Sequence, residues 1–100
     1  TTPYRASYCN HVFHQYTLVL NDVKRDGLNA FLAEHNIPSM IYYPVPGHQQ
    51  QMFAQYETAK VSLPVTDWLT ERVISLPIHT EMDNEQLNFI TTKVLEYINR

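Results

Sequence analysis

The sequence predicts an α+β fold, in which a small, mostly antiparallel sheet of about three strands carries helices packed on one face. Strand and helix patterns alternate along the chain in the order strand, helix, strand, short helix, helix, strand, helix. The chain has 100 residues, which suits one domain with a modest core. We expect the other face of the sheet to meet solvent or another domain.

The first strand is predicted over residues 12–20, after a lead-in at residues 1–10 that has no periodicity. Tyr16, Leu18 and Leu20 occupy every second position, as the apolar side of a strand does. This alternation predicts that the three side chains share one face of the sheet.

The first helix is predicted to begin at Asn21 and Asp22, which can cap it, and to run to about His35. Asn36 can adopt the left-handed conformation that ends a helix, and Pro38 prevents the helix from resuming. Positions three and four apart place four residues on one apolar stripe: Leu28, Phe31, Leu32 and His35.

The second strand is predicted over residues 39–43, and a short helix over residues 48–56. Pro64 fits the first turn of a further helix, because the missing N–H of proline is not needed there. One face of this helix is expected to lie in the core and consists of Val65, Trp68, Leu69 and Arg72.

The third strand is predicted over residues 73–76, and Pro77 ends it. Asp83 and Gln86 resemble a capping box at the start of the last helix. The apolar stripe of that helix consists of Leu87, Ile90, Val94 and Ile98.

Composition and charge argue against several classes of protein. The net charge is −3, so no basic surface argues for nucleic acid, and no apolar run approaches the roughly 20 residues that span a bilayer. Cys9 is the only cysteine, which excludes an intrachain disulfide and suits a reducing, cytoplasmic location. There is no initiator methionine and no signal peptide, and we expect the start at Thr1 to be a cut inside a longer chain.

The ionisable residues form neither a complete catalytic set nor a metal site. His11 and His14 point to opposite faces of a strand, so we do not expect them to bind one metal ion. Cys9 lacks an orienting partner, and none of the three lysines lies in a stretch that predicts a Schiff-base role. His14 and Tyr16 share a predicted strand face, either as a half-buried polar pair or as part of a site.

The loop over residues 41–49 is the most distinctive part of the chain. Two prolines and a glycine stop regular structure there and bring three side chains near one another: Tyr42, Tyr43 and His48. The loop is either a structural turn with packed aromatics or a binding loop, since rigid loops at strand ends often carry binding groups. If exposed, nearby aromatic residues would form a docking surface made of Tyr4, Tyr8, Phe13, Tyr16, Tyr42 and Tyr43.

Three motifs keep a common order and spacing from His11 onward. They are His-Val-Phe-His-Gln-Tyr-Thr at 11–17 with Arg-Asp-x-Leu at 25–28, Asn-Ile-Pro at 36–38 with Tyr-Tyr-Pro-Val-Pro-x-His at 42–48, and Ser-Leu-Pro-Ile-His at 75–79 with Met82 and Glu85-Gln86 after it. In these motifs the chain resembles the C-terminal small domain of a sugar aminotransferase of the DegT/DnrJ/EryC1/StrS family. Gly47 stands where a leucine is usual in the family.

The resemblance implies that residues 11–100 are the C-terminal small domain and that residues 1–10 lead in from a missing N-terminal large domain. Members of the family are pyridoxal phosphate (PLP) enzymes of fold type I and are generally homodimers. They transfer an amino group, commonly from glutamate, to a keto-sugar linked to a nucleotide diphosphate. Their cofactor lysine belongs to the large domain, so the resemblance implies that this chain alone binds no cofactor and is inactive.

By the same resemblance, the chain closes one side of the substrate cleft. Tyr42 and Tyr43 lie where family members contact the nucleotide sugar, and the further candidates are His14, Gln15, Tyr16 and His48. These residues would orient the substrate, and none of them is expected to be catalytic. Two alternatives are a free-standing interaction or regulatory module and a small-ligand sensor of ferredoxin-like type.

Overall fold

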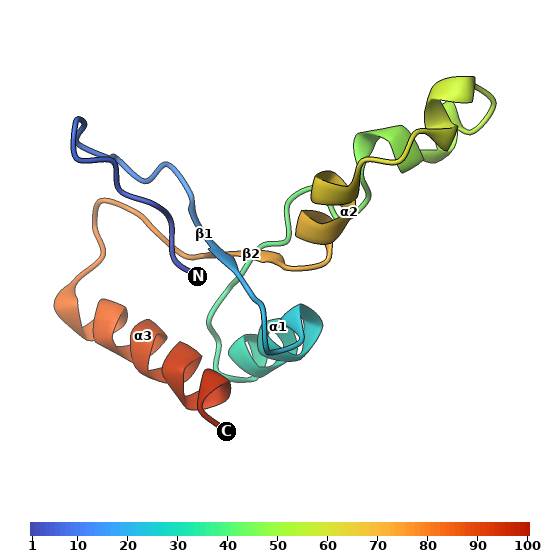
Figure 1. Cartoon of the computed structure of the whole chain (residues 1–100). Helices are drawn as coiled ribbons and strands as arrows, with labels where there is room; N and C mark the ends of the chain where they lie inside the picture. Colours follow the sequence, from blue (N-terminus) through green and yellow to red (C-terminus); the bar gives the residue numbers. More distant parts are fainter.

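The computed structural model describes residues 1–100, apart from the side chains of residues 58 and 59. A strand and a helix come first, three short 3-10 helices and a second α-helix follow, and a strand and a helix end the chain (Figure 1). The elements are β1 Tyr16–Val19, α1 Arg25–Glu34, η1 Gly47–Gln49, η2 Gln51–Phe53, η3 Glu57–Lys60, α2 Pro64–Thr70, β2 Val73–Leu76 and α3 Asn84–Ile98. The predicted α+β class is confirmed.

The strands β1 and β2 form an antiparallel pair, in which Thr17 lies opposite Ser75 and Leu18 lies opposite Ile74. Because side chains alternate across a strand, Leu18 and Ile74 point to one face of the sheet and Thr17 and Ser75 to the other. Leu18 and Ile74 are buried in the core, whereas the hydroxyl groups of Thr17 and Ser75 hydrogen-bond to each other at 2.8 Å. The sheet therefore has an apolar face and a polar face.

The second predicted strand, at residues 39–43, is wrong, whereas the third, at residues 73–76, is confirmed as β2. Only Met40 pairs with β2: its N–H donates to the carbonyl of Ser75 at 2.9 Å, and its carbonyl accepts from the N–H of Ser75 at 2.8 Å. Strand pairing stops soon afterwards, because Tyr43 has a left-handed φ of 54° and Pro44 has no N–H to donate. The described residues thus form a sheet of two strands in place of about three.

The hydrophobic core lies between the apolar face of the sheet and the helices α1 and α3, which cover this face (Figure 1). The predicted stripe of α1 is confirmed, because Leu28, Phe31 and Leu32 are buried and His35 is half-buried behind them. The other core residues are Leu18, Leu20, Ile37, Ile74 and Val94.

Several helix ends follow local signals in the sequence. Asn36 has a φ of 58° just beyond α1, and Pro64 occupies the first turn of α2, both as predicted. The predicted capping box of α3 is confirmed, since the Asp83 side chain accepts a hydrogen bond from the N–H of Gln86 at 2.8 Å. No helix among the described residues is long and apolar enough to cross a bilayer.

The predicted cap of α1 is wrong. The helix begins at Arg25, and Lys24 takes the cap position without a side-chain hydrogen bond to the helix. Asn21 and Asp22 lie in a bend before it, where the side chain of Asn21 donates to the hydroxyl of Thr1 at 3.2 Å. A contact with the start of the chain thus takes the place of the helix cap.

Residues 44–70 form an arm that projects from the body and carries α2 (Figure 1). The radius of gyration is accordingly 16.0 Å, against about 13 Å for a compact domain of this length. Trp68 is 43% exposed on this arm, so its predicted place in the core is wrong; the guanidinium of Arg72 lies 5.0 Å from its ring. The predicted helix at residues 48–56 is replaced by η1 and η2, which Gln50 separates.

Candidate functional site

Most of the candidate binding residues meet at the polar face of the sheet. A hollow of about 220 Å³ lies there, and its lining includes His14, Gln15 and Tyr42. A second hollow of about 160 Å³ shares Gln15 and Tyr42 with the first and adds Tyr43 and Thr17. The structure therefore brings four of the six predicted residues around one surface: His14, Gln15, Tyr42 and Tyr43.

The local backbone explains how the two tyrosines are presented. The chain leaves the sheet after the Met40 bridge, and Tyr43 takes a left-handed backbone that is unusual for a bulky residue. Such a conformation costs on the order of 1–3 kcal/mol and is found most often at functional sites. Pro46 is buried three residues later, while the Tyr43 side chain is 85% exposed. The loop is anchored at its end and presents Tyr43 to solvent.

The two hollows combine polar groups with apolar side chains and carry no fixed charge among the described side chains. No lysine, arginine, aspartate or glutamate lines either of them among the described side chains. Their polar groups are the hydroxyls of Thr17, Ser39, Tyr42, Tyr43 and Ser75, the amide of Gln15 and the imidazole of His14. Hydroxyl and amide groups can donate hydrogen bonds to the oxygen atoms of a phosphate or a sugar. The arrangement can thus bind and orient a polar ligand, and it contains no carboxylate for acid–base chemistry.

Tyr16 lies apart from this group. Phe13 has a φ of 46°, so the extended backbone is interrupted, and β1 begins only at Tyr16. His14 and Tyr16 consequently do not share a strand face as predicted: His14 lines the polar hollow, and Tyr16 lines an apolar groove on the other side of the sheet. The aromatic residues are divided in the same way, since Phe13 also faces the groove.

His48 lies on the arm, in η1, and lines neither hollow. Its side chain is only 9% exposed, and its Nε2 lies 3.3 Å from Oδ1 of Asp67 in α2. The amide of Gln49 donates to the same oxygen at 3.1 Å. Nδ1 of His48 is buried and has no hydrogen-bond partner among the described residues. His48 therefore joins the two sides of the arm.

Asp67 is not among the residues that the sequence predicts for the site. An acidic residue in the first turn of a helix is already explained by the helix dipole, so nothing marked Asp67 as a partner of His48. The two residues are also 19 positions apart, and no local periodicity relates them.

Resident PLP is held in enzymes through a lysine. None of the three lysines lines the polar hollows. Lys60 pairs with Glu57 at 2.7 Å, and Lys93 pairs with Glu96 at 2.8 Å. Lys24 precedes α1 and lines a separate, larger hollow. Among the described side chains, no cluster of three or more His, Cys, Asp or Glu could hold a metal ion.

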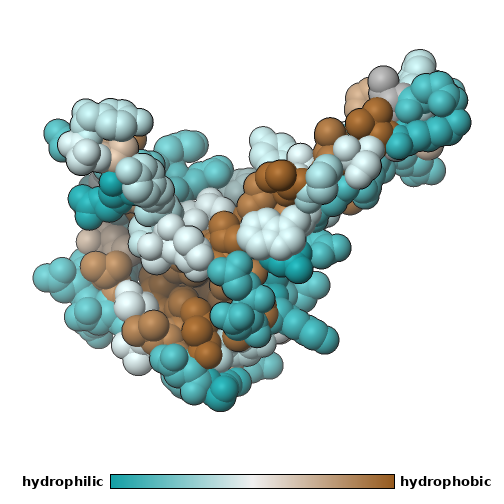
Figure 2. All heavy atoms as spheres, viewed as in Figure 1, coloured by the Kyte–Doolittle hydropathy of each residue, from teal (hydrophilic) through white to brown (hydrophobic). Residues whose placement is uncertain are grey.

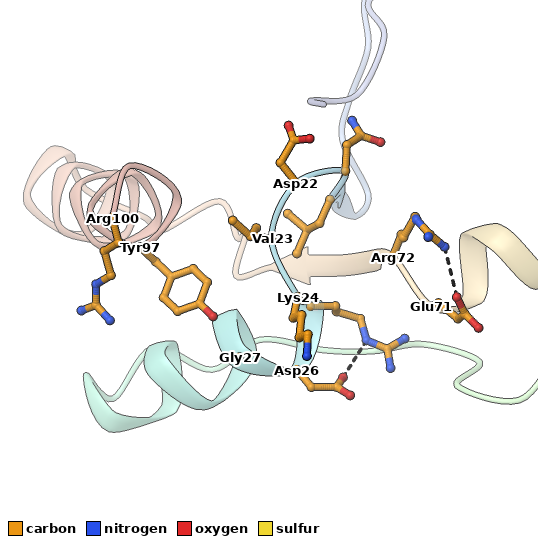
Figure 3. A pocket seen from close by; sticks show the side chains of 12 residues that line it. Asp22, Val23, Lys24, Asp26, Gly27, Glu71, Arg72, Tyr97 and Arg100 are labelled. Carbon is orange, nitrogen blue, oxygen red and sulfur yellow. Dashed lines mark hydrogen bonds and ion pairs between the residues drawn. The ribbon is translucent and has the colours of Figure 1, made fainter.

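The largest hollow, about 770 Å³, lies between the starts and ends of three helices and contains none of the six predicted residues (Figure 3). Its charged side chains largely pair with each other. Arg25 lies 2.9 Å from Asp26, and Arg72 lies 3.1 Å from Glu71. Its other charged side chains are Asp22, Lys24 and Arg100, and Arg100 lies 3.5 Å from Glu96 outside the basin. Because the basin contains none of the six predicted binding residues, it is not the candidate site.

Comparison with known proteins shows what the chain is related to. Residues 1–95 match the DegT/DnrJ/EryC1/StrS aminotransferase family. The chain is 47% identical over 85 residues to UDP-N-acetyl-3-dehydro-alpha-D-glucosamine 3-aminotransferase of Acidithiobacillus ferrooxidans, which covers 85% of this chain and 22% of that protein. It is 38% identical over 96 residues to the "Pleiotropic regulatory protein" of Geobacillus stearothermophilus, covering 96% of this chain and 25% of that protein.

A solved structure agrees with these relatives. A DegT DnrJ EryC1 StrS aminotransferase from Brucella abortus superimposes with a TM-score of 0.73 at 34% identity, covering 86% of this chain and 22% of that one. The chain thus spans about a quarter or less of the length of the relatives it matches. With a family match over nearly its whole length, the chain belongs to the DegT/DnrJ/EryC1/StrS aminotransferase family.

Proposed function

We propose that residues 11–100 are the C-terminal small domain of a PLP-dependent nucleotide-sugar aminotransferase, with residues 1–10 leading in from a large N-terminal domain. The polar hollow of this domain forms one wall of the substrate cleft. The observation that carries this proposal is the clustering of Tyr42, Tyr43, His14 and Gln15 in a chain whose family match covers residues 1–95.

The chemistry of the hollow suits a substrate-orienting role. A nucleotide sugar presents phosphate, hydroxyl and carbonyl oxygens, and the hydroxyls of Tyr42 and Tyr43 and the amide of Gln15 can each donate to such atoms. Tyrosine rings can also pack against a sugar or a base. Since no carboxylate or lysine among the described side chains lines the hollow, these residues hold the keto-sugar in position and leave the proton transfers to groups outside this chain.

His48 supports this wall from the arm. Its contact with Asp67 fixes η1 against α2, and η1 follows directly after the loop that carries the two tyrosines. We therefore assign His48 a positioning role, in which it holds the loop and does not touch the substrate. Tyr16 lies outside the wall because it faces the apolar groove.

The cofactor belongs to the parent protein and not to this chain. PLP supplies the amino-transfer chemistry of the family, commonly with glutamate as donor, and the lysines described above lie away from the hollow. The parent is proposed to be a cytoplasmic homodimer in which the missing large domain holds PLP.

The absorbance of PLP tests this division of roles. PLP added to the full-length parent should give the band of a lysine-linked cofactor, whereas PLP added to this 100-residue chain should give only the spectrum of the free compound. A strong lysine-linked band from the 100-residue chain alone would contradict the proposal.

A second candidate function is a protein-interaction or regulatory module. The name of the Geobacillus stearothermophilus relative and the exposed apolar side chains of the arm favour it. The coding sequence separates the two candidates. An upstream coding region of a few hundred codons that contains an active-site lysine supports the aminotransferase, and a reading frame that begins near Thr1 supports the module.

A further inference from the structure

An apolar groove runs between the apolar face of the sheet and α3. It has a volume of about 410 Å³, and none of the side chains that line it is charged. Figure 2 shows the corresponding apolar surface as a hollowed patch over the body of the molecule. Its walls include Tyr16 and Leu76 from the sheet and Leu87, Leu95 and Ile98 from α3.

The groove leaves the predicted stripe of α3 only partly covered. Val94 is buried, but Leu87 is 50% exposed and Ile98 is 39% exposed. Leu95, which also lines the groove next to this stripe, is 51% exposed. A contiguous apolar hollow of this kind marks a surface that binds another polypeptide segment or a ligand. The groove is lined by side chains and not by a free strand edge, which suits the apolar side of a helix better than an added strand.

The start of the chain lies in this groove. Thr1 and Thr2 belong to its lining. The nitrogen of Thr1 donates to the carbonyl of Val19 at 2.7 Å, and the N–H of Val19 donates to the carbonyl of Thr1 at 3.0 Å. This reciprocal pair fixes Thr1 beside β1. In a longer parent, the preceding residue would be bonded to the nitrogen of Thr1, which already lies at the groove.

We propose that the apolar groove is filled, in the parent protein, by apolar side chains of the segment that directly precedes Thr1. The inference rests on the proposed function, since it requires the longer parent. A segment joined directly to Thr1 has a much higher effective concentration at the groove than a second copy of the chain or a separate partner, so it is favoured as the occupant. The same contact would complete the core and fix the small domain to the rest of the parent.

Photo-crosslinking in the full-length parent tests the inference. Benzoylphenylalanine replaces Leu95 in one variant and Phe89 in a matched control, because Phe89 lies on the same helix, is 46% exposed and does not line the groove. After irradiation, the crosslinked peptides are identified by mass spectrometry. We expect the variant at position 95 to crosslink within its own chain to residues preceding Thr1, at least ten times more than the variant at position 89.

Other occupants give different products. A crosslink from position 95 to a second subunit, which doubles the mass, would overturn the proposal, and so would a yield no higher than that of the control. A variant at position 87 repeats the test should the variant at position 95 fail to fold. Aminotransferase activity is measured separately on the unmodified parent, so that a failure of the proposed function and a failure of the groove contact are distinct results.

Discussion

Replacing Tyr43 by phenylalanine in the full-length parent isolates one contact of the proposed substrate wall. The side chain is 85% exposed, so the substitution should not change the stability of the fold. A hydrogen bond from this hydroxyl to a charged phosphate oxygen is worth about 1.5–3 kcal/mol. We therefore expect kcat/KM for the nucleotide sugar to fall roughly 10- to 150-fold.

Steady-state kinetics with a saturating amino donor measure this change, and the absorbance of bound PLP shows that the cofactor is retained. Tyr8→Phe is the matched control, because Tyr8 is 90% exposed and lines neither polar hollow. Equal kcat/KM values for Tyr43→Phe, Tyr8→Phe and the unmodified parent would refute the role of Tyr43.

Three further predictions concern the fold. Gly27→Ala should lower the free energy of unfolding, measured in urea, by about 1 kcal/mol. The added methyl group would overlap the hydroxyl of Tyr97, and this overlap should cost more than alanine gains through its better helix propensity. In a Tyr97→Leu background, which removes the overlap, the same change should be stabilising. Asp83→Ala should also lower the free energy of unfolding by about 1 kcal/mol, because it removes the capping box of α3. Asp22→Ala is the control: Lys24, and not Asp22, takes the cap position of α1, so this change should shift the unfolding midpoint little. The hydrogen bond from Lys93, followed by the charges of Lys93 and Arg100, lowers the pKa of Glu96 from its ordinary value of 4.5. A carboxyl group whose pKa is lowered in the folded state stabilises the fold at pH values above its ordinary pKa, and this stabilisation is lost as the pH falls. Between about pH 5 and pH 3, the melting temperature of the unmodified chain should therefore fall more than that of Glu96→Gln.

Local signals in the sequence predicted the parts of the fold that short-range physics determines. The buried stripe of α1, the left-handed Asn36, Pro64 in the first turn of α2 and the capping box at Asp83 each depend on residues within a few positions. Backbone geometry and helix periodicity act over this range, so one sequence is enough to identify them.

The errors come from features that depend on distant parts of the chain. The face that contains Trp68 is apolar at helical spacing, but spacing does not say whether this chain or another one covers it. The left-handed Phe13 and Tyr43 are not of a residue type that favours this backbone, and they shortened one predicted strand and removed another. Asn21 contacts Thr1 where a helix cap was predicted, which is also a long-range contact.

The candidate site was predicted in the same uneven way. The loop prolines and the family motifs identified Tyr42, Tyr43, His14 and Gln15, which the structure brings together. The separation of Tyr16 from His14 depends on the backbone at Phe13, and the contact of His48 with Asp67 depends on how the arm folds back. Neither could be obtained from sequence spacing.

A crystal structure of the full-length parent with a nucleotide sugar bound tests the central claim most directly. The distance to measure joins the hydroxyl oxygen of Tyr42 or Tyr43 to the nearest phosphate or sugar oxygen. The substrate-wall proposal predicts a hydrogen-bonding distance of about 2.5–3.2 Å for at least one of the two tyrosines. A substrate bound with the polar hollow empty and both hydroxyls beyond the reach of a bridging water would contradict it.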